Sequence, residues 1–222
     1  MKIKIIAASA IVFVLLVGVL GVQQYILSQI TSRVEREIPK ASGVSASVPL
    51  ADLPSNITSD SIKSVNISIK SFVLKENGTK TSLKISASDI SKAKPTMAGS
   101  LEVTATISAS TIAESSEFND AQIVGNTLQV SVGPGGVGTA LLIPKYSNSQ
   151  IYFELQSVSF LGNQIPASSL PAELQNQIKS RSQRSLTPPK GLTVESVSLS
   201  SKGLSVNMIG SNIQLGNLGS SL

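Results

Sequence analysis

Few side chains in this sequence are of types that could do catalytic chemistry. The chain has 222 residues and contains no histidine, cysteine or tryptophan. Without histidine and cysteine it cannot form Ser-His-Asp or Cys-His nucleophile systems, zinc sites built on either residue, or the usual general base near neutral pH. The lack of cysteine also excludes disulfides. The sequence therefore predicts a protein that is not an enzyme and needs no cofactor.

Three short stretches match patterns with known chemistry, and each has a simpler explanation. The run Gly133 to Gly138 fits G-x-G-x-x-G, but Pro144 and the strand-like residues before it leave no room for a helix that would hold a pyrophosphate. Ser91 to Lys94 fits the S-x-x-K motif of penicillin-recognising enzymes, yet the partner motifs SDN and KTG are missing. The third group could bind a metal but is more typical of helix caps or solvated side chains: Glu114, Glu117 and Asp120. We predict no metal site.

Basic side chains are the remaining candidates for binding chemistry. The formal net charge is +5, and aromatic residues make up 4% of the chain, too few to build stacking platforms for nucleic acid. The charge therefore favours anionic lipid headgroups, or else it only keeps a β-rich protein soluble. Lysine and arginine bind phosphate through charge-assisted hydrogen bonds. One basic cluster predicts a headgroup site, with a solvated loop as the alternative: Lys179, Arg181, Arg184 and Lys190.

The N-terminus predicts export from the cytoplasm. Lys2 and Lys4 precede an apolar run from Ile5 to Val22, which is near the lower limit for crossing ~30 Å of hydrocarbon. No comparable run follows, so the positive-inside bias places the rest of the chain outside the cytoplasm. Residues 1–22 are a signal peptide or a signal anchor. The poor match of Val19-Leu20-Gly21 to a cleavage site favours an anchor, and hence a single-pass protein of the cell membrane.

The spacing of the apolar residues predicts the helices and strands that would position a headgroup site. Five apolar residues four apart, from Val22 to Ile38, predict an amphipathic helix over 23–38 that Pro39 ends. The Ser-, Ala- and Pro-rich stretch 41–55 is typical of a loop. From Ile62 onward the period is two, which predicts half-buried antiparallel strands around 65–69, 83–87, 101–107, 128–132, 141–146, 151–160, 192–199 and 204–209.

Local features refine this arrangement. Asn77-Gly78 predicts a hairpin turn between the first two strands. The apolar alternation changes phase within 151–160 and within 192–199, as a β-bulge would cause, and bulges bend sheets. A second short helix is predicted from Pro171 to about Arg184, with Ser169 as a possible cap.

Together these patterns predict an α+β fold in which a strongly curved antiparallel sheet wraps around the long N-terminal helix. Residues 23–38 would form the helix and 39–222 the sheet, and 23–222 would be one domain. A body of this length can bury a core without disulfides.

Several segments resemble the actinobacterial LmeA-type phospholipid-binding proteins. They are the runs 99–106 and 128–134, and above all Pro188 to Leu192 followed by Ser201 to Val206. The resemblance extends from the end of the apolar run to about Leu215 and lies in strand and turn patterns. It implies an exported, non-catalytic protein with a tubular lipid-binding fold that binds anionic phospholipid and supports the cell envelope.

A curved sheet on an apolar-striped helix would enclose an elongated apolar interior suited to an acyl chain. We expect the lining to include Ile26, Ile30, Val34, Val65, Ile67, Ile69, Val103, Ile107, Val130, Phe153, Val194 and Val206. The simpler alternative is that these side chains fill a packed core. The protein would then be an anchored, non-catalytic scaffold whose sheet binds another envelope protein.

Overall fold

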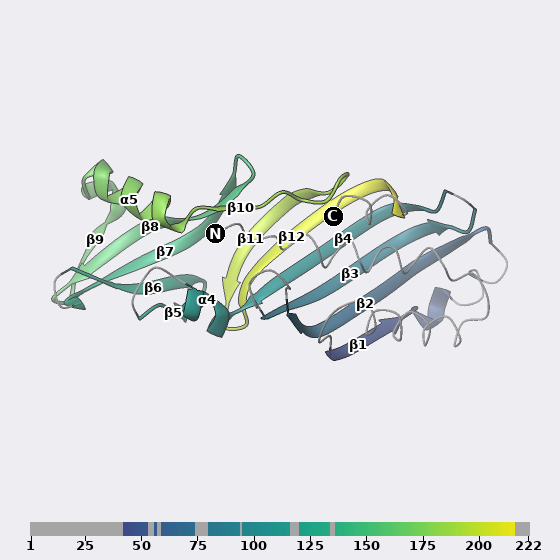
Figure 1. The fold of residues 1–222 in the computed structure, drawn as a ribbon, viewed down its shortest axis with the longest axis horizontal. Coiled ribbons are helices and arrows are strands. Elements are labelled where there is room, and N and C mark those ends of the chain that lie inside the picture. The colour runs from purple at the N-terminus through teal and green to yellow at the C-terminus, as the bar shows by residue number, and fades with distance from the viewer. Residues whose placement is uncertain are drawn as a thin grey trace. The chain divides into compact units, whose positions relative to one another are not determined.

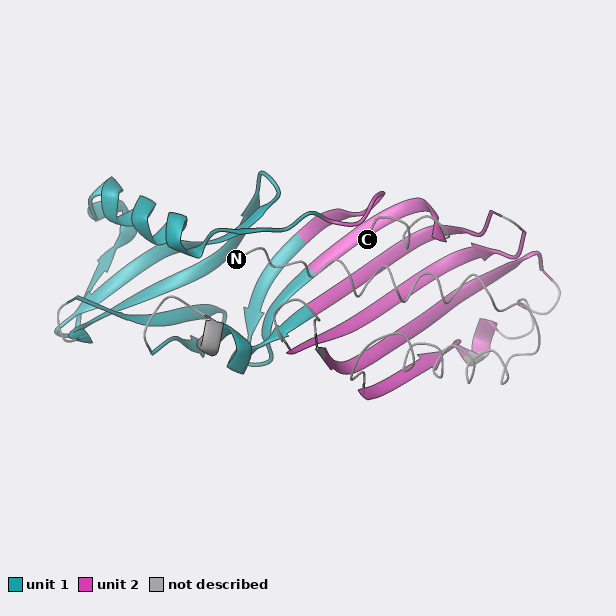
Figure 2. Ribbon diagram, in the orientation of Figure 1, with its two compact units in different colours: residues 1–3, 106–187, 196–206 teal, residues 4–105, 188–195, 207–222 magenta. Residues whose placement is uncertain are grey.

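A computed structural model describes residues 42–52, 56, 59–73, 80–93, 95–115, 120–133 and 136–215 (Figure 1). The chain divides into two compact units (Figure 2). The described residues of unit 1 fall within 106–187 and 196–206, and those of unit 2 within 42–105, 188–195 and 207–215.

Six strands form the first sheet, which we call sheet A. In spatial order they are β1 (Ser42–Ser47), β2 (Ser61–Val73), β3 (Lys80–Ser91), β4 (Met97–Ser108), β12 (Gly203–Gln214) and β11 (Thr193–Ser200). The chain forms β1 to β4 in sequence and returns to the sheet with its last two strands. A short 3-10 turn, η1 (Leu50–Asp52), precedes β2, and Asp52 accepts a hydrogen bond from Ser64 at 2.6 Å.

Sheet B is built entirely from the chain between β4 and β11. Its order is β10 (Arg184–Ser185), β8 (Gln150–Phe160), β7 (Gly138–Ser147), β6 (Thr127–Val132) and β5 (Gln122–Val124), and β9 (Asn163–Pro166) also pairs with β8. The described helices are α4 (Ala109–Ser115), α5 (Ala172–Ser182) and the 3-10 turn η3 (Ala167–Ser169). Pro171 is the N-cap of α5, so the predicted cap at Ser169 is wrong.

The period-two pattern is confirmed because each predicted strand segment lies within an observed strand or overlaps one closely. β2 and β3 pair antiparallel from Val73 opposite Lys80, as the hairpin signal required; the turn itself lies outside the described residues. The register of β7 and β8 shifts between Leu141 and Leu142, which confirms the bulge predicted from the phase change in 151–160. The stretch 41–55 is not only loop, since β1 lies within it.

The predicted α+β fold is wrong. The described residues form two antiparallel sheets with only short helices, and no sheet wraps a long helix among them. Alternation reveals that each strand has one apolar face, but it does not reveal which strands share a sheet. The helix predicted over 23–38, with Ile26, Ile30 and Val34, lies outside the described residues.

The prediction of a membrane anchor is also contradicted. Across the residues that the structure describes, every helix is too short or too polar to cross a membrane. The longer α-helix, α5, has 11 residues, whereas a span needs about 20. The apolar run from Ile5 to Val22, on which the anchor and the single-pass location depended, lies outside the described residues.

Helix α5 packs on β8 and protects its open edge. β9 pairs with the end of β8 and β10 with its start, which leaves the middle of the strand without a partner strand on that side. There the backbone N–H of Phe153 donates to Ser182 Oγ at 2.9 Å, and the Ser182 hydroxyl lies 3.0 Å from the Lys179 carbonyl oxygen. A side chain of the last helical turn therefore replaces a missing strand.

We expect Ser182→Ala to lower the free energy of unfolding by about 1–3 kcal/mol, because the Phe153 N–H loses its acceptor in a buried place. The matched control is Ser180→Ala on the same helix, where an exposed hydroxyl donates only to the Gln177 carbonyl. Its effect should stay within about 0.5 kcal/mol. Urea denaturation followed by circular dichroism measures both. Equal midpoints for the two variants would show that the contact does not stabilise the edge.

Candidate functional site

The most extensive apolar surface in the described chain is one face of sheet A. Its side chains are aliphatic and at most 4% exposed: Val65, Ile67, Ile69, Leu83, Ile85, Ala87, Ile90, Ala98, Leu101, Val103, Ala105, Ile107, Val206 and Met208. They come from four neighbouring strands, β2, β3, β4 and β12. We call this set the aliphatic face.

The opposite face of sheet A is polar, as the alternation requires. Hydroxyl and amide groups on it form hydrogen bonds between strands, of which Ser86 to Asn66 at 2.8 Å joins β3 to β2. Ser88 and Ser100 lie 2.7 Å apart, and Asn207 donates to Glu195 at 2.8 Å. In these bonds the polar side chains pair with one another across neighbouring strands.

The described part of unit 2 offers no second layer for the aliphatic face. Its elements with described bounds are strands of sheet A and the turn η1, and Asn56 is a single described helical residue (Figure 2). The side chains are nonetheless almost inaccessible to solvent. The aliphatic face is therefore an interior surface, and three of its positions carry alanine, which reaches less far into that interior than leucine or isoleucine.

The residues predicted to line a tunnel fall in different parts of the fold. Seven of them are buried, at most 4% exposed: Val65, Ile67, Ile69, Val103, Ile107, Val130 and Val206. All but Val130 belong to sheet A; Val130 is on β6 of sheet B. Phe153 on β8 and Val194 on β11 are half-buried. The structure thus brings six of these residues onto one face of sheet A. Val194 alternates with Glu195 of the polar face and so lies on the aliphatic side of the edge strand β11, whereas Val130 and Phe153 belong to sheet B.

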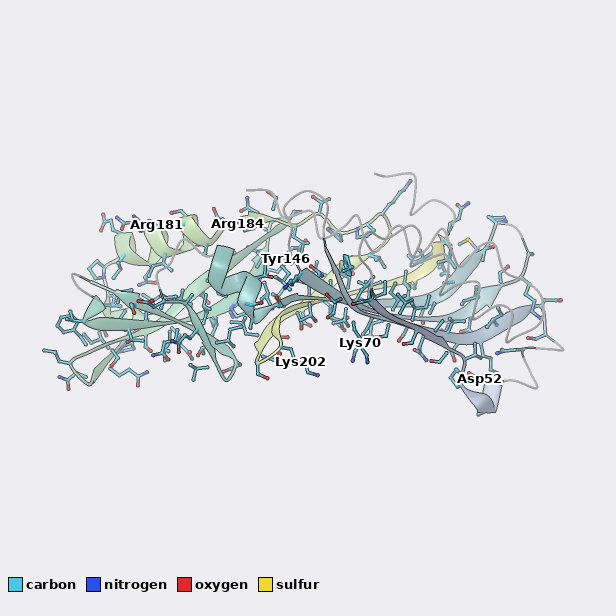
Figure 3. The ribbon with its side chains drawn as sticks, turned by 60° about the horizontal axis from the view of Figure 1, so that its bottom comes forward. Asp52, Lys70, Tyr146, Arg181, Arg184 and Lys202 are labelled. Atoms are coloured by element: carbon cyan, nitrogen blue, oxygen red, sulfur yellow. The ribbon has the colours of Figure 1, made fainter. Side chains whose placement is uncertain are left out.

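The predicted headgroup cluster is divided in the same way. Lys179, Arg181 and Arg184 lie at the C-terminal end of α5 in unit 1, where Figure 3 labels the two arginines, whereas Lys190 belongs to unit 2. Arg184 Nη1 donates to the carbonyls of Arg181 and Gln183 at 2.9 and 2.8 Å, so it caps the helix.

Lys179 also has a structural contact. Its ammonium lies 4.5 Å from the centre of the Tyr152 ring on β8, within the range of a cation–π interaction. Lys179 therefore holds α5 against sheet B, and Arg184, which follows the helix in β10, caps its C-terminal end. Arg181 is exposed.

The other motif candidates have local structural roles. Ser91 donates to the Ala93 carbonyl, whereas Lys94, the lysine of the S-x-x-K match, lies outside the described residues. Between them, Lys92 Nζ donates to the carbonyls of Asn56 and Ser59 at 2.7 and 2.6 Å, which is a structural role. The glycine-rich stretch joins β6 to β7, with Val132 opposite Gly138. A strand follows it, as predicted, rather than a helix. No cluster of metal-ligating side chains occurs among the described residues, which do not include the side chains of Glu114 and Glu117.

Sequence reasoning missed what the segment Pro188 to Leu192 does. Leu192 N donates to the Pro189 carbonyl at 2.9 Å, closing a tight turn with Gly191 at a φ of 88°. A Cβ on Gly191 would lie 2.8 Å from Ile213 Cδ1 at the end of β12. Glycine at the third position of such a turn is expected, because that position needs a positive φ. The segment therefore positions β11 beside β12.

The chain matches no protein-family model, no curated protein and no solved structure. The resemblance to LmeA-type proteins therefore remains a prediction based on the segments quoted for it. Two of them, 188–192 and 201–206, contain the turn residues that shape the end strands of sheet A.

Proposed function

We propose that this protein is a non-catalytic binding protein that holds the acyl chain of a lipid against the aliphatic face of sheet A. The observation that supports this most directly is the continuity of that face across β2, β3, β4 and β12, where fourteen aliphatic side chains lie together. Thr81, near the start of β3, is a buried polar side chain at its margin. An acyl chain has no hydrogen-bonding groups, so a surface that is aliphatic over most of its extent suits it.

The surroundings of the face support binding rather than catalysis. The residue types that most enzymes use as nucleophile and general base near neutral pH are missing from the whole chain, which has no histidine or cysteine. Lys179 contacts the Tyr152 ring and Arg184 donates to two backbone carbonyls, so the headgroup site at the basic cluster stays a prediction from the sequence. The proposal concerns the acyl chain alone.

The test is native mass spectrometry of the full chain, purified without detergent, followed by solvent extraction of any bound lipid. We expect lipid with the wild type and at least about tenfold less with Val103→Trp, whose indole would occupy the space of the acyl chain. If that space exists, the melting temperature should fall only slightly. In a fully packed interior the same substitution would lower the free energy of unfolding by about 1–3 kcal/mol or more.

Thr104→Trp is the matched control. Thr104 is the next residue of β4 and lies on the polar face, where it donates to Asn207 at 3.3 Å. This variant should retain as much lipid as the wild type. If the wild type carries no lipid and Val103→Trp melts far below Thr104→Trp, the interior is solidly packed and the proposed function is wrong.

A further inference from the structure

A second apolar surface lies in unit 1, at the end of sheet B where β8 turns into β9 (Figure 1). Four large hydrophobic side chains are exposed there: Val137 at 53%, Phe160 at 41%, Leu161 at 79% and Ile165 at 37%. We call these residues the apolar tip. Single exposed apolar residues are ordinary, but a contiguous group of this kind marks an interaction site.

Three side chains of the apolar tip, those of Val137, Phe160 and Ile165, share one face, and Leu161 follows Phe160 in the turn. A Cβ built on Gly138 would lie 3.2 Å from Phe160 Cδ2, and one built on Gly133 would lie 4.0 Å from both the Phe160 ring and Val137 Cγ2. The Phe160 ring therefore lies over two glycines, with Val137 beside it. Ile165 is paired with Val158, two residues before Phe160, and so lies on the same face.

The backbone of the turn is unfavourable for the residue that it exposes most. Phe160 is opposite Asn163, so Leu161 and Gly162 form a two-residue turn, with φ values of 49° and 84°. Positive φ at both positions is typical of Asn-Gly, because leucine is disfavoured in the left-handed region. A turn optimised only for folding would carry asparagine at 161. The conformation of the turn therefore does not account for leucine at this position.

No charged side chain belongs to the apolar tip. The basic end of α5 is at the other end of β8, since Arg184 pairs with Ile151. Phe160 lies nine positions after Ile151 along the strand, which corresponds to about 30 Å. Attraction between these arginines and a surface at the tip would be largely screened over that distance. The contact at the tip must therefore be apolar.

The size of the apolar tip favours a lipid surface over a protein. Its exposed apolar area is on the order of 350 Å², whereas a stable protein interface needs roughly 800 Å² from each partner. Phenylalanine and leucine at a protruding turn insert readily into the boundary between lipid headgroups and acyl chains. We propose that the apolar tip inserts into the surface of a lipid bilayer. This proposal uses a surface separate from sheet A and does not depend on the proposed function.

The natural chain has no tryptophan, so a single one reports on its own surroundings. We would measure the emission of the full-length Leu161→Trp variant with and without phosphatidylcholine vesicles. The emission maximum should move to shorter wavelength with vesicles, and salt should not reverse the shift, because the contact is apolar. Since the signal arises only at position 161, binding of vesicles by any other segment does not produce it.

Asn126→Trp is the matched control. Asn126 is exposed in the turn between β5 and β6, a second two-residue hairpin of unit 1, and its tryptophan should show no shift. Adding Val137→Asp to Leu161→Trp should weaken vesicle binding at the tip at least about tenfold, as measured by the same shift. Leu161→Asn should melt at or above the wild-type temperature, because asparagine is favoured at a φ of 49°.

Three results would overturn the proposal. The first is an unchanged emission of Leu161→Trp on addition of vesicles. The second is a shift that persists when Val137→Asp is added. The third is a shift that appears with rising protein concentration in the absence of lipid, which would identify the apolar tip as a contact between two copies of the chain.

Discussion

Replacing Gly203 with alanine should destabilise the protein more than the same replacement at any other described glycine. Gly203 begins β12 and is buried, with a φ of 129°. A Cβ at this position would overlap the carbonyl oxygen of Ile107, lie 2.8 Å from its carbonyl carbon and lie 2.9 Å from the nitrogen of Ala109.

All three of these atoms belong to the backbone at the end of β4 and the start of α4, so no flexible side chain can move aside. The strand pair would have to separate locally, and the hydrogen bond from Ala109 N to the Lys202 carbonyl, at 3.3 Å, would be lost. We expect the free energy of unfolding to fall by more than about 3 kcal/mol, a loss that a domain of ordinary stability can barely sustain.

Gly125→Ala separates this clash from the cost of backbone conformation. Gly125 also has a positive φ, 62°, but a Cβ there would meet nothing within 4 Å. Its substitution should cost only about 1 kcal/mol, through strain in the left-handed region. Urea denaturation of both variants measures the difference. Similar midpoints for the two would mean that β4 and β12 are not held together as tightly as described.

Ile85→Asp should have the second largest effect. Ile85 lies on β3, is 1% exposed and belongs to the aliphatic face. A carboxylate there would be buried among aliphatic side chains without a partner, so it must stay protonated or draw water into the interior, and either response is costly. We expect a loss of more than about 3 kcal/mol, and partial unfolding at neutral pH.

Lys84→Asp introduces the same side chain at the preceding residue of β3, on the polar face. Lys84 is exposed, so the change should alter stability by no more than about 0.5 kcal/mol. Thermal melting of the two variants followed by circular dichroism tests the contrast. Comparable melting temperatures would show that the aliphatic face is open to water rather than interior, which would also remove the main support for the proposed function.

The strands were predictable because alternation is a local property. A period of two in residues such as Val65, Ile67 and Ile69 requires that one face of the strand be apolar, whatever the strand packs against. The bulge in β8 was predictable for the same reason, since an extra residue shifts the phase of the pattern. The short strand β1 was missed because its segment, Ser42–Ser47, is mostly serine and small residues, which are typical of loops.

The candidate sites were only partly predictable. Seven predicted lining residues are buried, as their positions on apolar faces required, but Phe153 and Val194 are only half-buried. The basic cluster was predicted from proximity in sequence, which does not reveal that Tyr152 lies under Lys179 or that Arg184 caps α5. The apolar tip gave no sequence signal, because Phe160 and Leu161 read as the last residues of an apolar strand.

The sequence by itself determined where the longer strands lie, which face of each of them is apolar, and that the chemistry of histidine and cysteine is excluded. These follow from residue type and spacing along a few neighbouring positions. Only the tertiary structure decided that the strands divide into two sheets, that β12 rather than β5 lies beside β4, and that Gly203 meets the Ile107 carbonyl. The physical reason is that the pairing of strands depends on hydrogen bonds and packing between segments far apart in the chain. The alternation of apolar and polar residues is common to all the strands, so it does not distinguish one possible partner from another.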